Sequence, residues 1–246
     1  CEITTPSSIT ADEARMRLVQ VMGALAADAG VPGMLAPAAA VLSCVVPALE
    51  RPWKTALSRT CTGRVLTVGP GLKTGMPVHY DDPAEIGPDR IADAVAARAV
   101  YGSPCIVIDL GTTTNIEVID AHGTFVGGVI APGLALGARS LSAAAARLPQ
   151  VEPSAPTHVI GRNTREAMRS GVVLGEVARI DGMLDMVLAE MRATKAAGEG
   201  DVPIVITGDD AEALAALVGH SLTVDDALTL RGLAELYRIN QKPRRA

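Results

Sequence analysis

The feature that most limits the fold begins at Cys105, where three strands are expected in succession before the next helix. Cys105–Leu110 is an apolar run interrupted only by Asp109, and such runs are typical of a strand buried on both faces. Two further strands are predicted at Asn115–Asp120 and Thr124–Ile130. A plain doubly wound unit would alternate strand and helix from its first strand. The order therefore favours an α/β fold in which three strands precede the first crossover helix.

The composition points the same way. Hydrophobic residues make up 48% of the chain and aromatic residues only 2%. The core must then be built from Ala, Val, Leu and Ile, which suits alanine-rich helices on Val/Ile strands. An all-β sandwich with aromatic anchors does not fit that supply.

The part before residue 105 alternates strand and helix. Thr10-Ala-Asp-Glu13 is a capping box that opens a helix, which the segment Gly30–Gly33 ends. The apolar run Ala38–Val46, bounded by prolines, is typical of a buried parallel strand. The further predictions are a strand end at Cys1–Thr5, a helix near Pro47–Thr60, a strand at Arg64–Val68, a long functional loop over 69–90 and a helix over Ile91–Val100.

After residue 130 the pattern is helical with one more strand unit. A proline-broken connection, Leu148–Ile160, separates two helical stretches. The predicted elements are a helix that starts after Pro132 and runs to Arg147, a long helix or helix pair over Asn163–Arg192, a strand at Ile204–Thr207, a helix over Asp209–Val218, a short strand near Leu222 and a helix over Leu228–Asn240.

Charge and cysteine usage exclude several functions. The net charge is −5, and the basic tail Lys242–Arg245 is too short for a phosphate-backbone footprint, so direct nucleic-acid binding is not expected. The cysteines form no CxxC pair, and Cys44 and Cys105 lie in apolar runs that favour buried thiols. The histidines have no metal-ligand spacing. Without a membrane-length apolar run or a signal peptide, a cytoplasmic setting is expected.

The strongest chemical motif is Asp109-Leu-Gly111-Thr112 at the end of the predicted buried strand. A carboxylate there can hold a hydrated cation, and the turn that follows can present N–H and O–H groups to phosphate oxygens. An ordinary turn explains these residues about equally well.

The second motif is Gly87-Pro-Asp89-Arg90, just before a predicted helix. One interpretation makes Asp89 a helix cap and leaves Arg90 solvated. The other makes Asp89 a general base beside an arginine that grips an anionic group. Two weaker motifs are Ile160-Gly-Arg-Asn-Thr164, with Asn163 as the expected helix cap, and Thr207-Gly208 after a strand.

In this order the motifs resemble the type III pantothenate kinases, members of the superfamily of acetate kinase, the heat-shock cognate proteins and actin. The likeness covers nearly the whole chain. It also includes Ser43–Pro47, Pro70–Gly75, Tyr80-Asp, Gly127-Gly128, Pro132-Gly133 and Leu148-Pro149.

The resemblance implies two ribonuclease-H-like (actin-like ATPase) domains, expected at 1–104 and 105–246, with ATP bound between them. That family begins with a strand and an Asp-x-Gly-Asn-Thr loop. The chain therefore resembles a member whose first domain lacks its N-terminal strands.

The resemblance also implies roles for the candidate residues. Asp89 would be the general base; Tyr80, Gly87, Pro88, Arg90 and Thr164 would line the pantothenate site, with Thr164 reaching across a homodimer interface. Asp109 would bind a monovalent cation (K⁺ or NH₄⁺). Gly111, Thr112, Thr207 and Gly208 would contact ATP, which acts with Mg²⁺.

The function implied is ATP-dependent phosphorylation of pantothenate to 4'-phosphopantothenate, the first step of coenzyme A biosynthesis. The alternative is a catalytically inactive member that binds pantothenate or acts as a regulator resembling an accessory transcription factor.

Overall fold

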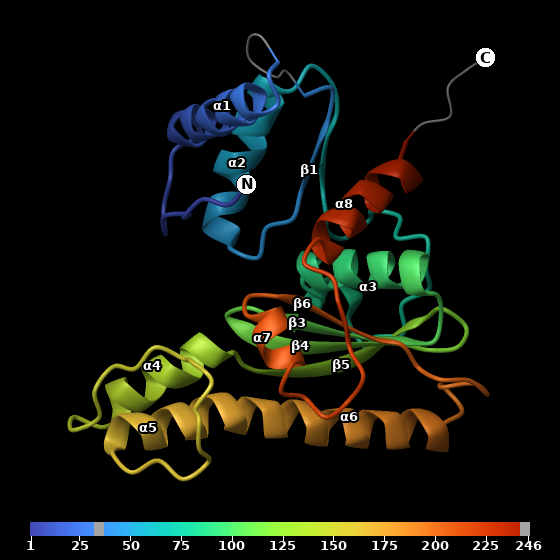
Figure 1. The fold of residues 1–246 in the computed structure, drawn as a ribbon. Coiled ribbons are helices and arrows are strands. Elements are labelled where there is room, and N and C mark those ends of the chain that lie inside the picture. Colours follow the sequence, from blue (N-terminus) through green and yellow to red (C-terminus); the bar gives the residue numbers. More distant parts are fainter. Residues whose placement is uncertain (32–36, 242–246) are drawn as a thin grey trace. The chain divides into compact units, whose positions relative to one another are not determined.

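The computed structural model describes residues 1–31 and 37–241 (Figure 1). The predicted basic tail lies outside these residues. The chain divides into two compact units: unit 1 comprises Cys1–Thr74, Ala84–Ile91 and Leu233–Ala246, and unit 2 comprises Gly75–Pro83 and Ala92–Gly232. Within the described residues, no helix has both the length and the apolar character needed to cross a membrane.

Unit 2 is built on a mixed five-stranded sheet with the order β5-β4-β3-β6-β7. The strands β3 (Cys105–Leu110), β4 (Thr113–Ile119) and β5 (Phe125–Pro132) form an antiparallel meander. The strands β6 (Ile204–Gly208) and β7 (Thr223–Val224) then add in parallel on the other side of β3. The three predicted consecutive strands are therefore present.

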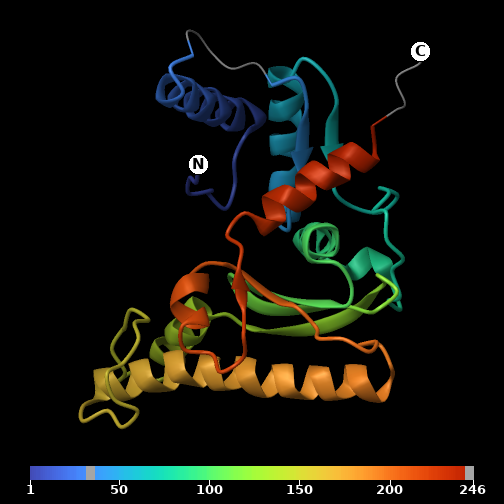
Figure 2. The same cartoon turned by 45° about the vertical axis from the view of Figure 1, so that its right-hand side comes forward.

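Helices cover both faces of this sheet (Figures 1 and 2). On one face lies α6 (Gly175–Ala193), which continues from α5 (Thr164–Arg169) through a π-helical turn at Ser170–Leu174. On the other face lies the unit 2 part of α3 (Pro88–Tyr101). The remaining helices with residues in unit 2 are α4 (Leu134–Ala144), α7 (Ala211–Ala215) and α8 (Leu228–Ile239), and a 3₁₀ turn covers Pro83–Glu85.

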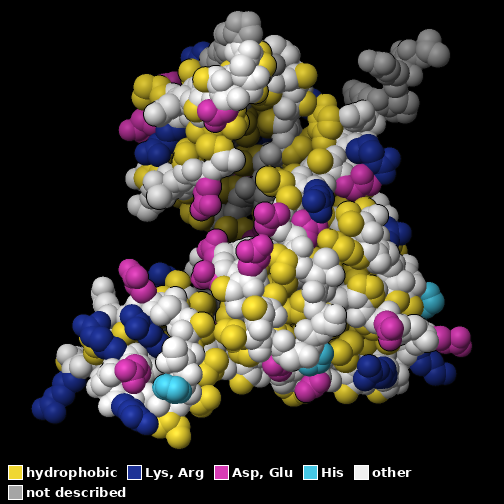
Figure 3. Space-filling model, in the orientation of Figure 1, with side chains coloured by type: hydrophobic (Ala, Val, Ile, Leu, Met, Phe, Trp, Pro, Cys, Tyr) yellow, Lys and Arg dark blue, Asp and Glu magenta, His cyan; other side chains and the backbone are white. Residues whose placement is uncertain are grey.

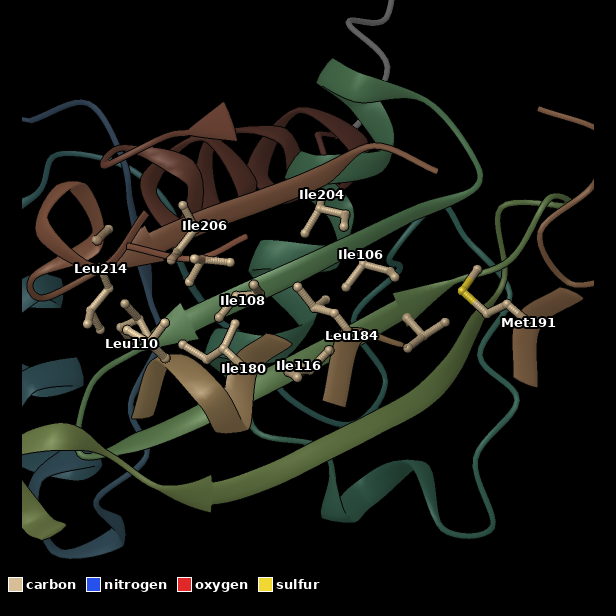
Figure 4. Close-up of a cluster of buried hydrophobic side chains, with 14 of the residues drawn as sticks. Ile106, Ile108, Leu110, Ile116, Ile180, Leu184, Met191, Ile204, Ile206 and Leu214 are labelled. Atoms are coloured by element: carbon tan, nitrogen blue, oxygen red, sulfur yellow. The ribbon is translucent and has the colours of Figure 1, made fainter. Parts of the chain in front are cut away.

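The core between the sheet and α6 is aliphatic, as the composition predicts. Ile180 and Leu184 of α6 point toward the strand residues Ile108 and Ile116 (Figure 4). Ile108, Ile180 and Leu184 are at most 1% exposed. Burying each such side chain contributes about 1.5–3 kcal/mol relative to leaving it in water.

Unit 1 holds a helix pair and a small parallel sheet. The helices α1 (Ala11–Asp28) and α2 (Pro47–Thr60) pack together, with Ala14 and Ala56 fully buried. The predicted capping box at the start of α1 is present: Thr10 Oγ1 accepts from Glu13 N–H at 3.2 Å, and Glu13 Oε2 accepts from Thr10 N–H at 2.8 Å. The strands β1 (Ala40–Leu42) and β2 (Val65–Thr67) pair in parallel.

Several predicted elements of unit 1 need correction. Cys1–Thr5 has no regular secondary structure. The buried strand expected at Ala38–Val46 is only β1, and its residues are half-buried because, within the described part of the chain, β1 pairs with β2 alone. Cys44 is likewise half-buried, whereas burial raises the pKa of the Cys105 thiol to about 12.

Three boundaries also differ. The helix α3 begins at Pro88 rather than Ile91, the helix predicted over Asp209–Val218 is confined to α7, and the predicted loop 69–90 contains the 3₁₀ turn. The predicted domain boundary at 104/105 stays a prediction.

Candidate active site

A row of polar side chains crosses the sheet of unit 2 near the carboxyl end of β3. Asp109 is in register with Asn115 on β4 and with Thr207 on β6. Thr207 is 2% and Asn115 5% exposed. Because strand side chains alternate between the two faces of a sheet, this row lies on the face opposite to the core in which Ile108 packs against α6. This edge of the sheet therefore places one carboxylate beside two neutral side chains whose oxygen atoms can act as cation ligands.

The sequence prediction included Asp109 and Thr207 but missed Asn115. The signal was present in the hairpin. A two-residue connection between β3 and β4 sets Asn115 directly opposite Asp109, so the hairpin register brings Asn115 to the same site.

The turn between β3 and β4 rests against the start of α4. Gly133 N–H donates to Thr112 O at 3.0 Å. A Cβ atom at Gly133 would lie 2.2 Å from Gly111 O and 2.8 Å from Thr112 O, so no side chain fits there. The exposed Thr112 is thus held beside the N-terminus of α4, where free backbone N–H groups favour anions.

A second glycine brings β6 equally close to β3. Gly208 has φ +90°, and a Cβ atom on it would lie 2.1 Å from Leu110 O and 2.9 Å from Asp109 Oδ1. Asp209 N–H also donates to Leu110 O at 2.7 Å. The ends of β3 and β6 are therefore locked together by backbone contacts.

A cavity of about 760 Å³ adjoins the end of β6. Its lining is mainly polar and includes the carboxylates of Asp210, Glu212 and Asp226.

The connection that follows α7 is held against α6 by hydrogen bonds to Asp181, because Gly219 N–H and His220 Nδ1 lie 3.0 and 2.9 Å from Asp181 Oδ1. Burial raises the pKa of the Asp181 carboxyl, but hydrogen bonds from His220 and Gly219 outweigh it, and that pKa lies below its ordinary value.

Tyr80 is fixed on the outer edge of the same sheet. Val78 forms a parallel bridge with Phe125, and His79 N–H donates to Phe125 O at 2.8 Å. The rings of Tyr80 and Phe125 are 6.1 Å apart, and Tyr80 Cε2 lies 3.8 Å from the ideal Cβ position of Gly127. This part of the predicted loop is therefore paired to β5, with Tyr80 placed over a glycine.

Gly87–Arg90 lie in unit 1, at the start of α3. Gly87 O accepts the first helical hydrogen bond, from Ile91 N–H at 3.2 Å, so Gly87 occupies the cap position and Pro88 the first helical one. Asp89 Oδ1 accepts from Arg90 N–H at 2.8 Å, and Asp89 is half-buried. The interpretation in which Asp89 caps the helix and Arg90 is solvated is wrong, since Arg90 is only 5% exposed.

Thr164 is carried by a separate element, at the start of α5. Asn163 caps this helix, as predicted: its Oδ1 accepts from Glu166 N–H at 3.0 Å. Thr164 itself is exposed. The hydrophobic side chains of Val159 and Ile160, 74% and 82% exposed, precede it. Figure 3 shows Lys and Arg side chains gathered over this end of unit 2, which includes Arg162 and Arg165.

The side-chain oxygens available as ligands determine which metal ions the site can bind. Among the residues that the structure describes, no cluster of three His, Cys, Asp or Glu side chains could hold a metal ion. The row at Asp109 offers one carboxylate and neutral oxygens, which suits a weakly held hard cation. Mg²⁺ generally needs only one or two protein carboxylates, because substrate phosphates and water complete its shell.

The fold is that of an α/β protein in which Asp109, Asn115 and Thr207 form a row of polar side chains near the carboxyl end of β3 in a mixed sheet. A family model described as type III pantothenate kinase matches residues 1–186. A type III pantothenate kinase of Koribacter versatilis is 42% identical over 82% of this chain and 71% of its own length. One of Nocardia farcinica is 41% identical over 99% of this chain and 88% of its own. The chain therefore belongs to the type III pantothenate kinase family.

Among solved structures, a Baf family protein of Campylobacter jejuni described as a transcriptional activator aligns with a TM-score of 0.53. It covers 80% of each chain at 22% identity. At that identity the likeness shows the fold alone.

Proposed function

We propose that the protein transfers the γ-phosphoryl group of ATP to the hydroxyl of pantothenate, giving 4'-phosphopantothenate and ADP. Two observations support the proposal. One is the match to the type III pantothenate kinase family, and the other is the close packing of two glycines at the carboxyl end of β3 in unit 2. Gly133 and Gly208 leave no space for a side chain beside Gly111 and Asp109. This close packing fixes the Gly111–Thr112 turn beside the N-terminus of α4, whose free backbone N–H groups can bind phosphate oxygens.

In this proposal Gly111, Thr112, Thr207 and Gly208 contact ATP. The exposed hydroxyl of Thr112 and the first N–H groups of α4 offer hydrogen bonds to phosphate oxygens. Mg²⁺, held mainly by the phosphates, would neutralise charge on them. Asp109, beside Asn115 and Thr207, would hold K⁺ or NH₄⁺.

Pantothenate is bound by Tyr80, Gly87, Pro88, Arg90 and Thr164, and Asp89 is the general base. The Asp89 carboxylate accepts the proton of the pantothenate hydroxyl as the oxygen attacks the γ-phosphorus atom. The bond from that phosphorus to the bridging oxygen breaks, and ADP leaves. Phosphoryl transfer depends on positioning and charge neutralisation more than on covalent help, so one carboxylate base is sufficient.

The proposal extends to the organisation of the protein. The strand order β5-β4-β3-β6-β7, a meander followed by two parallel strands, supports a ribonuclease-H-like domain over 105–246, with a second such domain over 1–104. The exposed Val159 and Ile160 beside Thr164 support a homodimer in which Thr164 reaches the partner's substrate. The cytoplasm, where ATP is supplied, is the proposed setting.

The test of the reaction is an assay of ADP release with ATP, Mg²⁺, K⁺ and pantothenate. We expect pantothenate-dependent release of ADP and a product heavier than pantothenate by one phosphate group in mass spectrometry. Omitting pantothenate controls for simple ATP hydrolysis. ADP release that is independent of pantothenate, or none at all, would exclude the proposed activity.

The cation site has its own prediction. Asp109→Ala should raise the K⁺ concentration needed for half-maximal activity by about tenfold, because it removes the carboxylate of the row; tenfold corresponds to about 1.4 kcal/mol of lost cation binding. The pantothenate KM should change little. Titrating activity against KCl measures the effect, with Asp201→Ala, at an exposed carboxylate on a connecting loop, as control. An unchanged K⁺ dependence would remove Asp109 from the cation site.

A further inference from the structure

A closed ring of hydrogen bonds joins the turn of Thr112 to the start of α4 through two side chains of α6. Thr114 Oγ1 donates to Glu176 Oε1 at 2.6 Å. The other oxygen of Glu176 accepts from Arg179, whose Nη2 also donates to Pro132 O at 2.5 Å. The ring closes through the backbone, because Gly133 N–H donates to Thr112 O at 3.0 Å.

The carboxylate of this ring, on Glu176, is buried, whereas Arg179 is about one third exposed: their side chains are 4% and 33% exposed. Glu176 is the second residue after the π-helical turn, and in the sequence it lies between the core residues Val173 and Val177. Thr114 is 3% exposed. Burying a carboxylate is unfavourable unless it is paired and hydrogen-bonded. A well-packed apolar replacement of such a pair is often as stable or more so, so stability alone is a weak reason for these charges.

The members of the ring lie at both supports of the proposed phosphate site. Thr114 is the second residue of β4, two residues after Thr112, and Pro132 ends β5 immediately before the cap of α4. Glu176 bonds to the first of these segments and Arg179 to the second, and the bond between the two side chains links them. A shift of either segment away from the other would break at least one hydrogen bond of the ring.

We infer that Glu176 and Arg179 are positioning residues for ATP, which hold the Gly111–Thr112 turn against the N-terminus of α4. This inference rests on the proposed function, because it assigns the ring to the phosphate-binding part of that site. Neither side chain touches substrate. Their effect passes through Thr114 and through the peptide oxygen of Pro132.

The test compares Glu176→Gln with Glu190→Gln, an exposed glutamate on the same helix. Glu176→Gln keeps an oxygen for Thr114 but turns an NH₂ group toward Arg179. We expect the KM for ATP to rise about tenfold, as for the loss of a hydrogen bond to a charged group, with the pantothenate KM within about twofold. Glu190→Gln should leave both KM values unchanged.

A second set of variants keeps the inference testable if Glu176→Gln folds poorly. Thr114→Val removes the hydroxyl and should reproduce the change in the KM for ATP, whereas Thr114→Ser retains it and should restore the wild-type value. Arg179→Met breaks the ring from its more exposed member. An equal rise of both KM values, or a Thr114→Ser enzyme as impaired as Thr114→Val, would overturn the inference.

Hydrogen exchange separates this inference from the proposed function. Amides at 111–114 and 133–137 should exchange faster in Glu176→Gln and Thr114→Val than in the wild type, whatever reaction the protein catalyses. Unchanged exchange in both variants would show that the ring does not hold these segments. Absent kinase activity in the wild type with faster exchange in the variants would overturn the proposed function and the assignment to ATP together, while leaving the ring itself in place.

Discussion

Replacing Asp89 by Asn should lower the kcat for pantothenate phosphorylation by about 10²–10⁴-fold, the usual contribution of a general base. The fold should persist. Asp89 lies in the first turn of α3, and its Oδ1 accepts a hydrogen bond from Arg90 N–H, which an asparagine oxygen can also accept. Steady-state kinetics measure the loss, and thermal unfolding checks the fold.

Glu85→Gln is the matched control for Asp89→Asn, since Glu85 is an exposed carboxylate shortly before α3 in the same unit. It should retain the wild-type rate. An Asp89→Asn enzyme within about threefold of the wild-type kcat would make Asp89 a helix residue without a catalytic role.

The second large effect is expected at Gly133. A methyl group there would lie 2.2 Å from Gly111 O, so Gly133→Ala must displace the turn that carries Thr112 or the start of α4. Overpacking of this kind destabilises by about 1–3 kcal/mol. A displacement of about 1 Å at a reacting group can reduce turnover about 10²-fold, and we expect a loss of that order in kcat/KM for ATP.

Gly137→Ala is the control, because Gly137 lies inside α4 with nothing within 4 Å of an added Cβ. It should keep full activity and gain about 0.5–1 kcal/mol of stability from the better helix propensity of alanine. Kinetics against ATP concentration and denaturant unfolding of both variants give the comparison. Equal activity of the two alanine variants would show that the turn needs no glycine contact.

Sequence reasoning succeeded where the signal is local. The capping box at Thr10 and Glu13 marks the start of α1, and Pro47 marks that of α2, because caps and prolines act on their own helical turn. The strand β3 follows from one apolar run. The order of motifs, through the family resemblance, supplied the candidate residues and the reaction.

Features that depend on distant partners were not predictable in this way. The burial of Arg90 and the half-exposure of β1 depend on what packs against them, not on their neighbours in sequence. Glu176 looks like an ordinary helix glutamate until the π-helical turn and Thr114 are seen together. Asn115 could have been placed opposite Asp109 from the sequence only if the two-residue turn, and with it the hairpin register, had been predicted first.

The sheet of unit 2 also has a consequence for the order in which the chain closes during folding. The meander β3–β4–β5 joins neighbouring segments, so its pairing, including Asp109 with Asn115, closes only short loops. Pairing Asp109 with Thr207 must close about a hundred residues, at a higher entropic cost and a slower rate. We therefore expect the proposed cation and nucleotide residues to come together in two stages, with the contribution of β6 arriving last.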